Sequence, residues 1–281
     1  MGALYYSATT LGKVDEQYSL RSKVKGIINN GFTLNFTGVG TVSIQTVETV
    51  DEVDYVPLGT DRFGQMTELG NGTHEYTLPQ DKAWTFSIDR KSREDTMGSM
   101  DVKKAVARQV RIVSIPNFDK YVLATVLAYA VTNSQVTENS GTALTTSNAY
   151  QYFLQLGEYL NDNDIENENI VVYMTRKKLN LLRRDPEFKV ACDKAYDDSK
   201  KGTVVPIDGM SIIVVPASYL PANTGYLALA DNVVAAPMKT NMTRILDDQR
   251  GIDGFVAEGR RRYGAFMGPN SGLAIVAHME A

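Results

Sequence analysis

The residue types that most often carry out catalysis or bind metals are few in this chain and are poorly placed for it. Its two histidines, His74 and His278, lie in neither an HExxH pattern nor a plausible catalytic triad. The chain contains no GxxxxGKS/T or GxGxxG phosphate-binding sequence. Its acidic pairs, as at residues 94–95, 197–198 and 247–248, are adjacent in sequence, which is more typical of solvated or helix-terminal carboxylates than of a general acid and base. The residues therefore predict a protein that is not an enzyme and that uses no cofactor or metal ion.

Positive charge is concentrated in two places, residues 176–184 and residues 260–262. On a β-strand, the first and third arginines of the second group point to the same face. A solvated face balanced by nearby carboxylates would explain both groups. The alternative is loose electrostatic contact with nucleic acid or with an acidic neighbour. The residues that would make such contacts are Arg176, Lys177, Lys178, Arg260 and Arg262.

The composition predicts a folded protein with a large core, since 43% of the 281 residues are hydrophobic. A formal net charge of -4 argues against general affinity for nucleic acid, which depends on clustered lysine and arginine. The single cysteine, Cys192, excludes an internal disulfide framework and a multi-thiolate metal site, and its spacing from Phe188 suggests a core position. The N-terminus lacks the pattern of a signal peptide and no stretch approaches a membrane span, so we expect an intracellular, soluble product.

The longest helical pattern covers residues 99–131, where apolar residues recur at spacings of three and four. A helix of this length would span about 50 Å. Pro116 lies inside it and removes one backbone donor, so we expect a kink near Val113, the alternative being two helices broken at the proline. The expected buried face consists of Val102, Val106, Val110, Val113, Pro116, Phe118, Val122 and Val126.

Before this helix, the pattern predicts an N-terminal arm over residues 1–40 and then a long hairpin. Apolar and polar residues alternate from Thr41 and again over residues 84–88, which predicts the two strands of that hairpin. The glycine-rich excursion between them, residues 56–82, is too long for an ordinary turn and indicates a lid or binding arm, unless it is a disordered surface loop. Its large side chains are Tyr55, Leu58, Arg62, Phe63, Met66 and Leu69.

After the long helix, residues 147–230 predict a compact α/β unit. An amphipathic helix, a strand at residues 170–174, a basic helix at residues 176–184 and two further strands follow one another. The remaining chain consists of short strands, which we expect to pack back on the long helix, so that the unit around that helix is discontinuous in sequence.

This order of elements resembles that of the major capsid proteins of tailed bacteriophages, which have the Hong Kong 97-type fold. The resemblance covers nearly the whole chain. Three segments add to it: residues 84–90 leading into the long helix, residues 115–121 around the proline, and residues 251–260. Each segment is a soft motif, and the resemblance rests on their order and spacing.

The resemblance implies an α+β fold with four parts. They are an N-terminal arm at residues 1–40, an extended E-loop at 41–90, a P domain with the spine helix at 91–146 that returns at 231–270, and an A domain at 147–230 with its last strand at 271–281. It also implies that the excursion residues named above contact neighbouring subunits. Family members that crosslink covalently do so through a loop lysine, but Lys82 lies near the base of this loop, and we do not carry that chemistry over.

The implied function is an icosahedral virion shell, made in the host cytoplasm, that encloses double-stranded DNA. The implied partners are further copies of the chain in pentamers and hexamers, a separate scaffolding protein, a portal protein and the packaged DNA, bound without sequence preference, with no membrane involved. An encapsulin-like compartment with the same fold is the nearest alternative. A soluble α/β enzyme or binding module is a more distant one, and it would require a polar constellation in the α/β unit that the sequence does not show.

Overall fold

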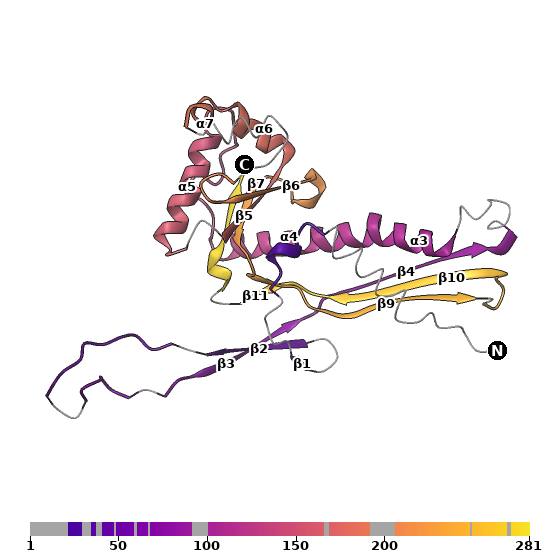
Figure 1. Ribbon diagram of the computed structural model, residues 1–281, viewed down its shortest axis with the longest axis horizontal. Helices are drawn as coiled ribbons and strands as arrows, with labels where there is room; N and C mark the ends of the chain where they lie inside the picture. Colours follow the sequence, from indigo (N-terminus) through magenta and orange to yellow (C-terminus); the bar gives the residue numbers. More distant parts are fainter. Residues whose placement is uncertain are drawn as a thin grey trace.

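The computed structural model describes residues 22–29, 35–37, 41–47, 49–58, 61–66, 68–91, 101–165, 169–191, 206–247, 249–268 and 271–281. Most of the predicted N-terminal arm lies outside the described residues, and so does Cys192. Within the described part, a long helix crosses the molecule between a four-stranded sheet and a narrower three-stranded sheet, and a hairpin projects from the body (Figure 1).

A single helix forms at the centre of the chain, as the apolar pattern predicts. It consists of α3 (Val102–Gln109), a π-helical turn η2 (Val110–Ser114) and α4 (Ile115–Thr132) without interruption. In the π turn the Ile115 N–H donates to the Val110 carbonyl, five residues back. Pro116 removes a donor and crowds the preceding turn, and the wider turn before it accommodates both effects.

The π turn also changes which residues face the core. The buried positions step by four from Val102 to Val106 and Val110, then by five to Ile115, and continue through Phe118, Val122, Val126 and Ala130. The expectation that Val113 is buried is therefore wrong: its exposed fraction is 40%. The extra residue in the turn rotates Val113 out of the buried stripe and brings Ile115 into it. Pro116 is only half-buried.

The three-stranded sheet is antiparallel in the order β4 (Gln80–Asp89), β10 (Gly254–Tyr263), β9 (Met238–Asp247). Helix α3 packs on it through a cluster formed by Ile88, Val102, Val106, Ile245 and Ala257. The strand around Trp84 was expected to pair with the strand that begins at Thr41. That expectation is wrong, because β4 pairs with β10 along its whole length.

The projecting hairpin pairs β2 (Thr41–Val47) with β3 (Asn71–Thr77), while the short β1 (Asn35–Thr37) lies on the other side of β2. The sequence of β3, NGTHEYT, has almost no apolar alternation, and for that reason the pattern did not reveal it. The hairpin is consequently shorter than predicted, and residues 49–58, 61–66 and 68–70 form its tip.

The four-stranded sheet has the order β12 (Ile275–Met279), β7 (Thr224–Ala230), β5 (Ile170–Thr175), β6 (Ser211–Val215), and only β5 and β6 run parallel. Alternate residues of β5 face opposite sides, as a strand requires. Ile170, Val172 and Met174 pack under α5 (Ala149–Asp162), α6 (Arg176–Arg184) and α7 (Pro186–Ala191), while Val171 and Tyr173 face α4. The sheet is therefore covered on both faces.

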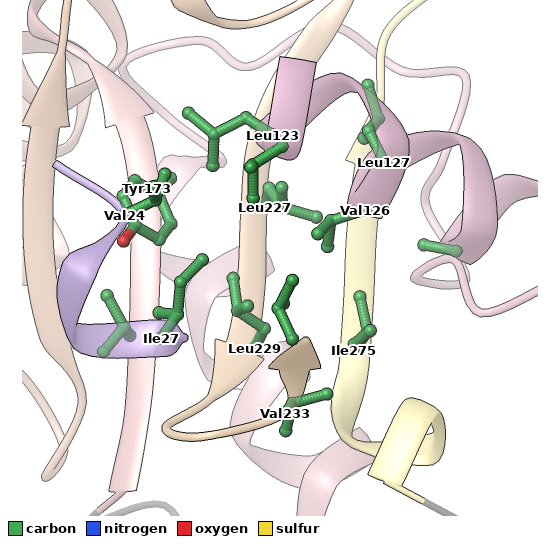
Figure 2. Close-up of a cluster of buried hydrophobic side chains, with 14 of the residues drawn as sticks. Val24, Ile27, Leu123, Val126, Leu127, Tyr173, Leu227, Leu229, Val233 and Ile275 are labelled. Atoms are coloured by element: carbon green, nitrogen blue, oxygen red, sulfur yellow. The ribbon is translucent and has the colours of Figure 1, made fainter. Parts of the chain in front are cut away.

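Smaller elements join the parts. Strands β8 (Val234–Ala235) and β11 (Phe266–Met267) pair beside the hairpin base, and the 3-10 turns are η1 (Lys25–Ile27), η4 (Ala217–Tyr219) and η5 (Ser271–Ala274). Val24, just before η1, and Ile27, at its end, lie in the core between α4 and the four-stranded sheet (Figure 2). None of the helices in the described ranges has the length and apolar content needed to span a membrane.

Candidate assembly surfaces

The hairpin tip carries the most exposed apolar side chains in the part of the chain that the structure describes. Leu58 and Phe63 are each 84% exposed and Met66 is 99% exposed. Tyr55 and Leu69 are also more than half exposed. Large apolar side chains left in water on a projecting element are a feature that protein-binding surfaces often have.

The tip has limited internal structure. The Tyr55 and Phe63 rings meet edge to face with centroids 5.1 Å apart, and the Val56 N–H donates to the Arg62 carbonyl over 3.1 Å. Gly64 has a φ of +81°, and an added Cβ there would lie 2.5 Å from Val53 Cγ2. The tip therefore has a defined turn but no core of its own. All six side chains predicted to contact neighbours lie on it: Tyr55, Leu58, Arg62, Phe63, Met66 and Leu69.

The tip is also acidic. Over its described residues it carries one basic side chain, Arg62, and five acidic ones: Asp51, Glu52, Asp54, Asp61 and Glu68. The sequence interpretation considered only the large side chains of this segment, Arg62 among them, and not its acidic residues. Like charges on an exposed arm oppose the pairing of tips with one another and favour a partner surface that is neutral or basic.

A small cluster holds the hairpin to the body. Its buried members are Val42, Ile44, Leu78, Ala235 and Phe266. Tyr76 stacks on Phe266 with ring centroids 4.2 Å apart and donates to the Met267 carbonyl over 3.1 Å. Burial raises the pKa of the Tyr76 phenol, with a smaller contribution from Tyr129. The hairpin is thus attached by a few contacts at its base while its tip is free of the body (Figure 1).

The two basic groups are placed differently from each other. Arg176 and Lys177 are exposed at the start of α6. Arg260 forms a two-point ion pair with Asp81 on the neighbouring strand, Nη2–Oδ2 2.6 Å and Nε–Oδ1 3.0 Å. This hydrogen bond lowers the pKa of the Asp81 carboxyl, and the Arg262 charge acts in the same direction. The pairing of Arg260 fits a balanced, solvated face, whereas Arg176 and Lys177 remain available for electrostatic contact.

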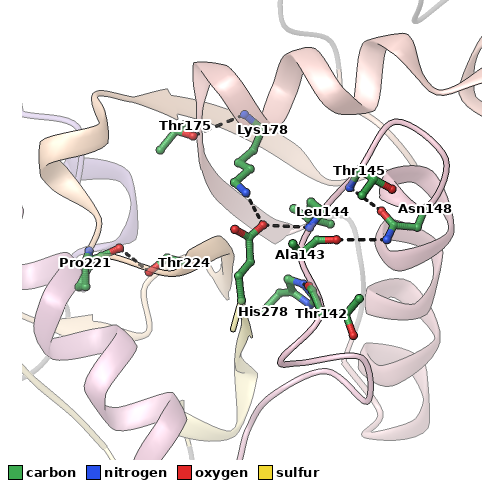
Figure 3. A network of polar contacts seen from close by, with 11 residues as sticks. Thr142, Ala143, Leu144, Thr145, Asn148, Thr175, Lys178, Pro221, Thr224 and His278 are labelled. Atoms are coloured by element: carbon green, nitrogen blue, oxygen red, sulfur yellow. Dashed lines mark hydrogen bonds and ion pairs between the residues drawn. The ribbon is translucent and has the colours of Figure 1, made fainter.

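Lys178 is not an exposed electrostatic contact, which corrects the sequence expectation. Its ammonium pairs with Glu280, and the two side chains are 14% and 13% exposed (Figure 3). Burial alone would raise the pKa of Glu280, but the hydrogen bonds from Lys178 and from the Leu144 N–H outweigh it and lower that pKa. Lys178 follows Arg176 by two residues in α6, which places it on nearly the opposite side of the helix. It therefore faces β12 rather than solvent.

Replacing Lys178 by methionine should therefore destabilise the subunit by about 2–4 kcal/mol, because the Glu280 carboxylate is left buried without its cation. The matched variant Lys177→Met, one residue away and exposed, should change stability by less than about 0.5 kcal/mol. Urea unfolding of both variants measures the difference. Equal stabilities would show that the ion pair contributes nothing.

His278 lies in the same polar region, fully buried and stacked on Tyr226 with centroids 5.2 Å apart. Its Nε2 lies 3.0 Å from the Thr142 carbonyl, which can only accept, so Nε2 carries the proton and Nδ1 accepts from the Thr137 hydroxyl over 2.9 Å. Burial lowers the pKa of His278 against the opposing effects of the Thr142 carbonyl and Glu280. The ring is a neutral structural group, as its satisfied partners indicate.

A lowered pKa makes stability depend on pH, because the unfolded chain binds a proton to His278 more readily than the folded one. The thermal midpoint should fall as pH decreases below about 6.5, the pKa of the unfolded histidine, and His278→Gln should weaken this dependence. His74→Gln, at an exposed position on β3, is the control and should leave it unchanged. Midpoints measured from pH 7.5 to 5.5 that are parallel in all three proteins would contradict the assignment.

The sequence interpretation missed one charged residue of structural importance, Asp119, whose exposed fraction is 0%. A signal was available: this acid follows Phe118 and lies four residues before Leu123, within the apolar stripe of α4. In the described ranges no cluster of three or more histidine, cysteine or acidic side chains could hold a metal ion. The features that stand out are an exposed tip and its attachment, which are suited to binding other protein subunits.

Comparison with known proteins relates the fold to that of shell-forming proteins. No family model and no curated protein matches the chain. Among solved structures, the capsid of cyanophage P-SCSP1u is 12% identical over 88% of this chain and 85% of that one, with a TM-score of 0.63. The mature capsid of bacteriophage PhiM1 is 10% identical over 92% and 87%, also with a TM-score of 0.63. A virus-like particle from Pyrococcus furiosus is 11% identical over 95% and 97%, with a TM-score of 0.56.

These likenesses extend over nearly the whole of each chain and define the class: a mixed helix and sheet fold shared with phage capsid proteins. At such low identity they establish the fold and leave the activity to be argued from the surfaces described above.

Proposed function

We propose that this chain is the major capsid protein of a tailed bacteriophage, a structural protein without enzymatic activity that assembles into an icosahedral shell around double-stranded DNA. The observation that carries the proposal is a capsid-protein fold over about nine-tenths of the chain, combined with a projecting hairpin whose tip leaves large apolar groups in water. In a lattice of overlapping subunits, a neighbouring subunit would cover the apolar side chains of the tip, which a monomeric enzyme would leave in water.

Within this proposal the segments take the roles of the Hong Kong 97-type fold. The hairpin β2–β3 with its tip is the projecting part of the E-loop (41–90), and the long helix is the spine of the P domain (91–146). The three-stranded sheet contains the return of that domain (231–270), and the four-stranded sheet with α5–α7 is the A domain (147–230). The final strand, within residues 271–281, belongs to the A domain sheet, which is supported by the pairing of β12 with β7. The N-terminal arm (1–40) precedes them.

The proposed partners follow from the assembly. The chain would associate with itself in pentamers and hexamers, with a separate scaffolding protein and a portal protein, and with packaged DNA through nonspecific contacts at residues such as Arg176 and Lys177. The acidic net charge of -4 limits this last contact to a weak, salt-sensitive one. The product would be made in the host cytoplasm and reside in the virion, without a membrane.

An encapsulin-like compartment is the second candidate, because the match to the virus-like particle from Pyrococcus furiosus, over 95% of this chain, is compatible with a shell of either kind. Both candidates form closed shells, so the contents distinguish them.

The test is electron microscopy of particles purified from cells that express this chain together with the products of the genes that neighbour its own gene. Closed icosahedral particles with nuclease-protected double-stranded DNA support the capsid proposal. Closed particles with a protein cargo and no protected DNA support the compartment. Monomers or small oligomers under all conditions would contradict both.

A further inference from the structure

Residues 22–29 form a short strap that crosses the buried junction between the long helix and the four-stranded sheet. Val24 and Ile27 are both fully buried (0% exposed) and pack among Leu123, Val126 and Leu227 (Figure 2). At its far end the Asn29 N–H donates to the Val234 carbonyl over 2.8 Å. The chain before Ser22 thus enters the described structure through this strap.

The polar anchor of the strap is the carboxylate of Asp119. Its Oδ1 accepts from Ser22 Oγ over 2.6 Å and its Oδ2 accepts from the Lys23 N–H over 2.8 Å. From the opposite side, the Tyr173 hydroxyl of β5 donates to the Lys23 carbonyl over 2.8 Å. Helix α4 therefore holds Ser22 and Lys23, and the sheet holds Lys23 from the other direction.

Within the described residues, the charge on this carboxylate has little compensation. An ionised carboxylate offers about four acceptor sites, and Ser22 Oγ and the Lys23 N–H, both neutral donors, occupy two of them. Among the residues that the structure describes, the charged groups nearby are Lys23, which is exposed, and Lys120, whose Nζ lies 5.8 Å from the centre of the Tyr219 ring. The other titratable groups around the site are the Tyr173 and Tyr219 phenols, both of which feel the Asp119 charge, and Asp231, which acts on Tyr173.

We propose that Asp119 is a proton-controlled latch that sets how tightly the strap is bound to the core. When the carboxyl is neutral, it can keep both partners, accepting from Lys23 N–H and donating to Ser22 Oγ, without a buried charge. When it is ionised, opening of the strap returns the charge to water. The strap is therefore closed more tightly in mild acid and opens more readily at neutral pH, which would release the preceding chain and expose an apolar face of the core.

The electrostatics agree in direction with this geometry. Burial raises the pKa of Asp119, and the hydrogen bonds from Lys23 and Ser22 and the Lys23 charge oppose it without cancelling it. A group whose pKa is higher when closed than when open favours the closed form below both values. That advantage is lost as pH rises through the closed-state pKa. Each unit of difference corresponds to a tenfold change in the opening equilibrium.

Hydrogen exchange of the unassembled subunit tests the latch, and it does so whether or not the chain forms capsids. Protection factors of the Lys23, Ile27 and Asn29 amides, corrected for intrinsic exchange, should fall by about tenfold or more between pH 4.5 and pH 8. In Asp119→Asn the side chain keeps both hydrogen bonds and carries no charge. Protection in that variant should be higher than in the wild type at pH 8 and independent of pH.

Two further variants serve as controls for the hydrogen-exchange experiment. Asp185→Asn is the matched control, since Asp185 is a buried aspartate that accepts from the Tyr150 and Glu187 N–H groups, both over 3.0 Å, elsewhere in the molecule. It should leave the pH dependence of the strap intact. If Asp119→Asn does not fold, Ser22→Ala removes one donor and should lower strap protection at every pH.

Three results would overturn the latch. They are strap protection in the wild type that does not change with pH, an equal change in the β5 amides that reports global unfolding, or an Asp119→Asn variant with the slope of the wild type.

Discussion

Replacement of Leu58, Phe63 and Met66 by serine should abolish closed shells while leaving the fold of the subunit intact. These side chains are at least 84% exposed and contribute almost nothing to the subunit core, so thermal unfolding and circular dichroism should be unchanged. At a subunit interface, each such anchor contributes about 1–4 kcal/mol, and every subunit of a shell would lose three of them. Sedimentation and electron microscopy of the variant, expressed with its scaffold, measure the outcome.

The control for this variant is Leu273→Ser, which removes an exposed leucine (62%) far from the tip in η5. Normal shells from the control and none from the triple variant would locate the assembly contacts on the tip. Normal shells from both would show that the tip is only a surface loop, and the inter-subunit role proposed for its residues would be wrong.

The second large effect is expected on the long helix. Val110→Asp should destabilise the subunit by about 3–5 kcal/mol, because position 110 is fully buried and the new charge has no partner. Val113→Asp, three residues later and 40% exposed, should cost less than about 1 kcal/mol. A regular helix would place both residues near one face, so the contrast tests the π turn.

Denaturant unfolding of the two variants measures this contrast, with soluble yield as a first indication. Comparable destabilisation by both substitutions would mean that Val113 is buried and that the turn before Pro116 is regular. A Val110→Asp variant that is as stable as the wild type would remove position 110 from the core.

The prediction of the helices depended on local patterns, and where those patterns were strong it was accurate. Thr175 caps α6 by accepting from the Lys178 N–H, and Pro186 begins α7, each at the helix position that its residue type favours. The strands β5 and β6 coincide with apolar runs rich in isoleucine and valine, and β7 coincides with an apolar run around Leu227 and Leu229; β5 and β7 are buried on both faces of the sheet. Such signals are contained within a few residues, so they can be interpreted without the fold.

The pairing of strands and the partners of charged groups could not be predicted in the same way. Trp84 lies opposite Gly259, where an added Cβ would be 2.4 Å from the indole, and this pairing joins residues 175 positions apart. Lys178 meets Glu280 and Asp119 meets Ser22 across separations of 102 and 97 residues. Nothing local in the sequence specifies such contacts.

The sequence by itself determined where most helices and buried strands lie, that the chain is acidic, and that a long glycine-rich excursion interrupts the first half of the chain, because periodicity, charge and composition are properties of adjacent residues. The tertiary structure decided the phase of the long helix, the strand opposite β2, and which cations are free and which are paired. It decided these because a single extra residue in a turn, or the arrival of a distant strand, changes which side of an element is buried.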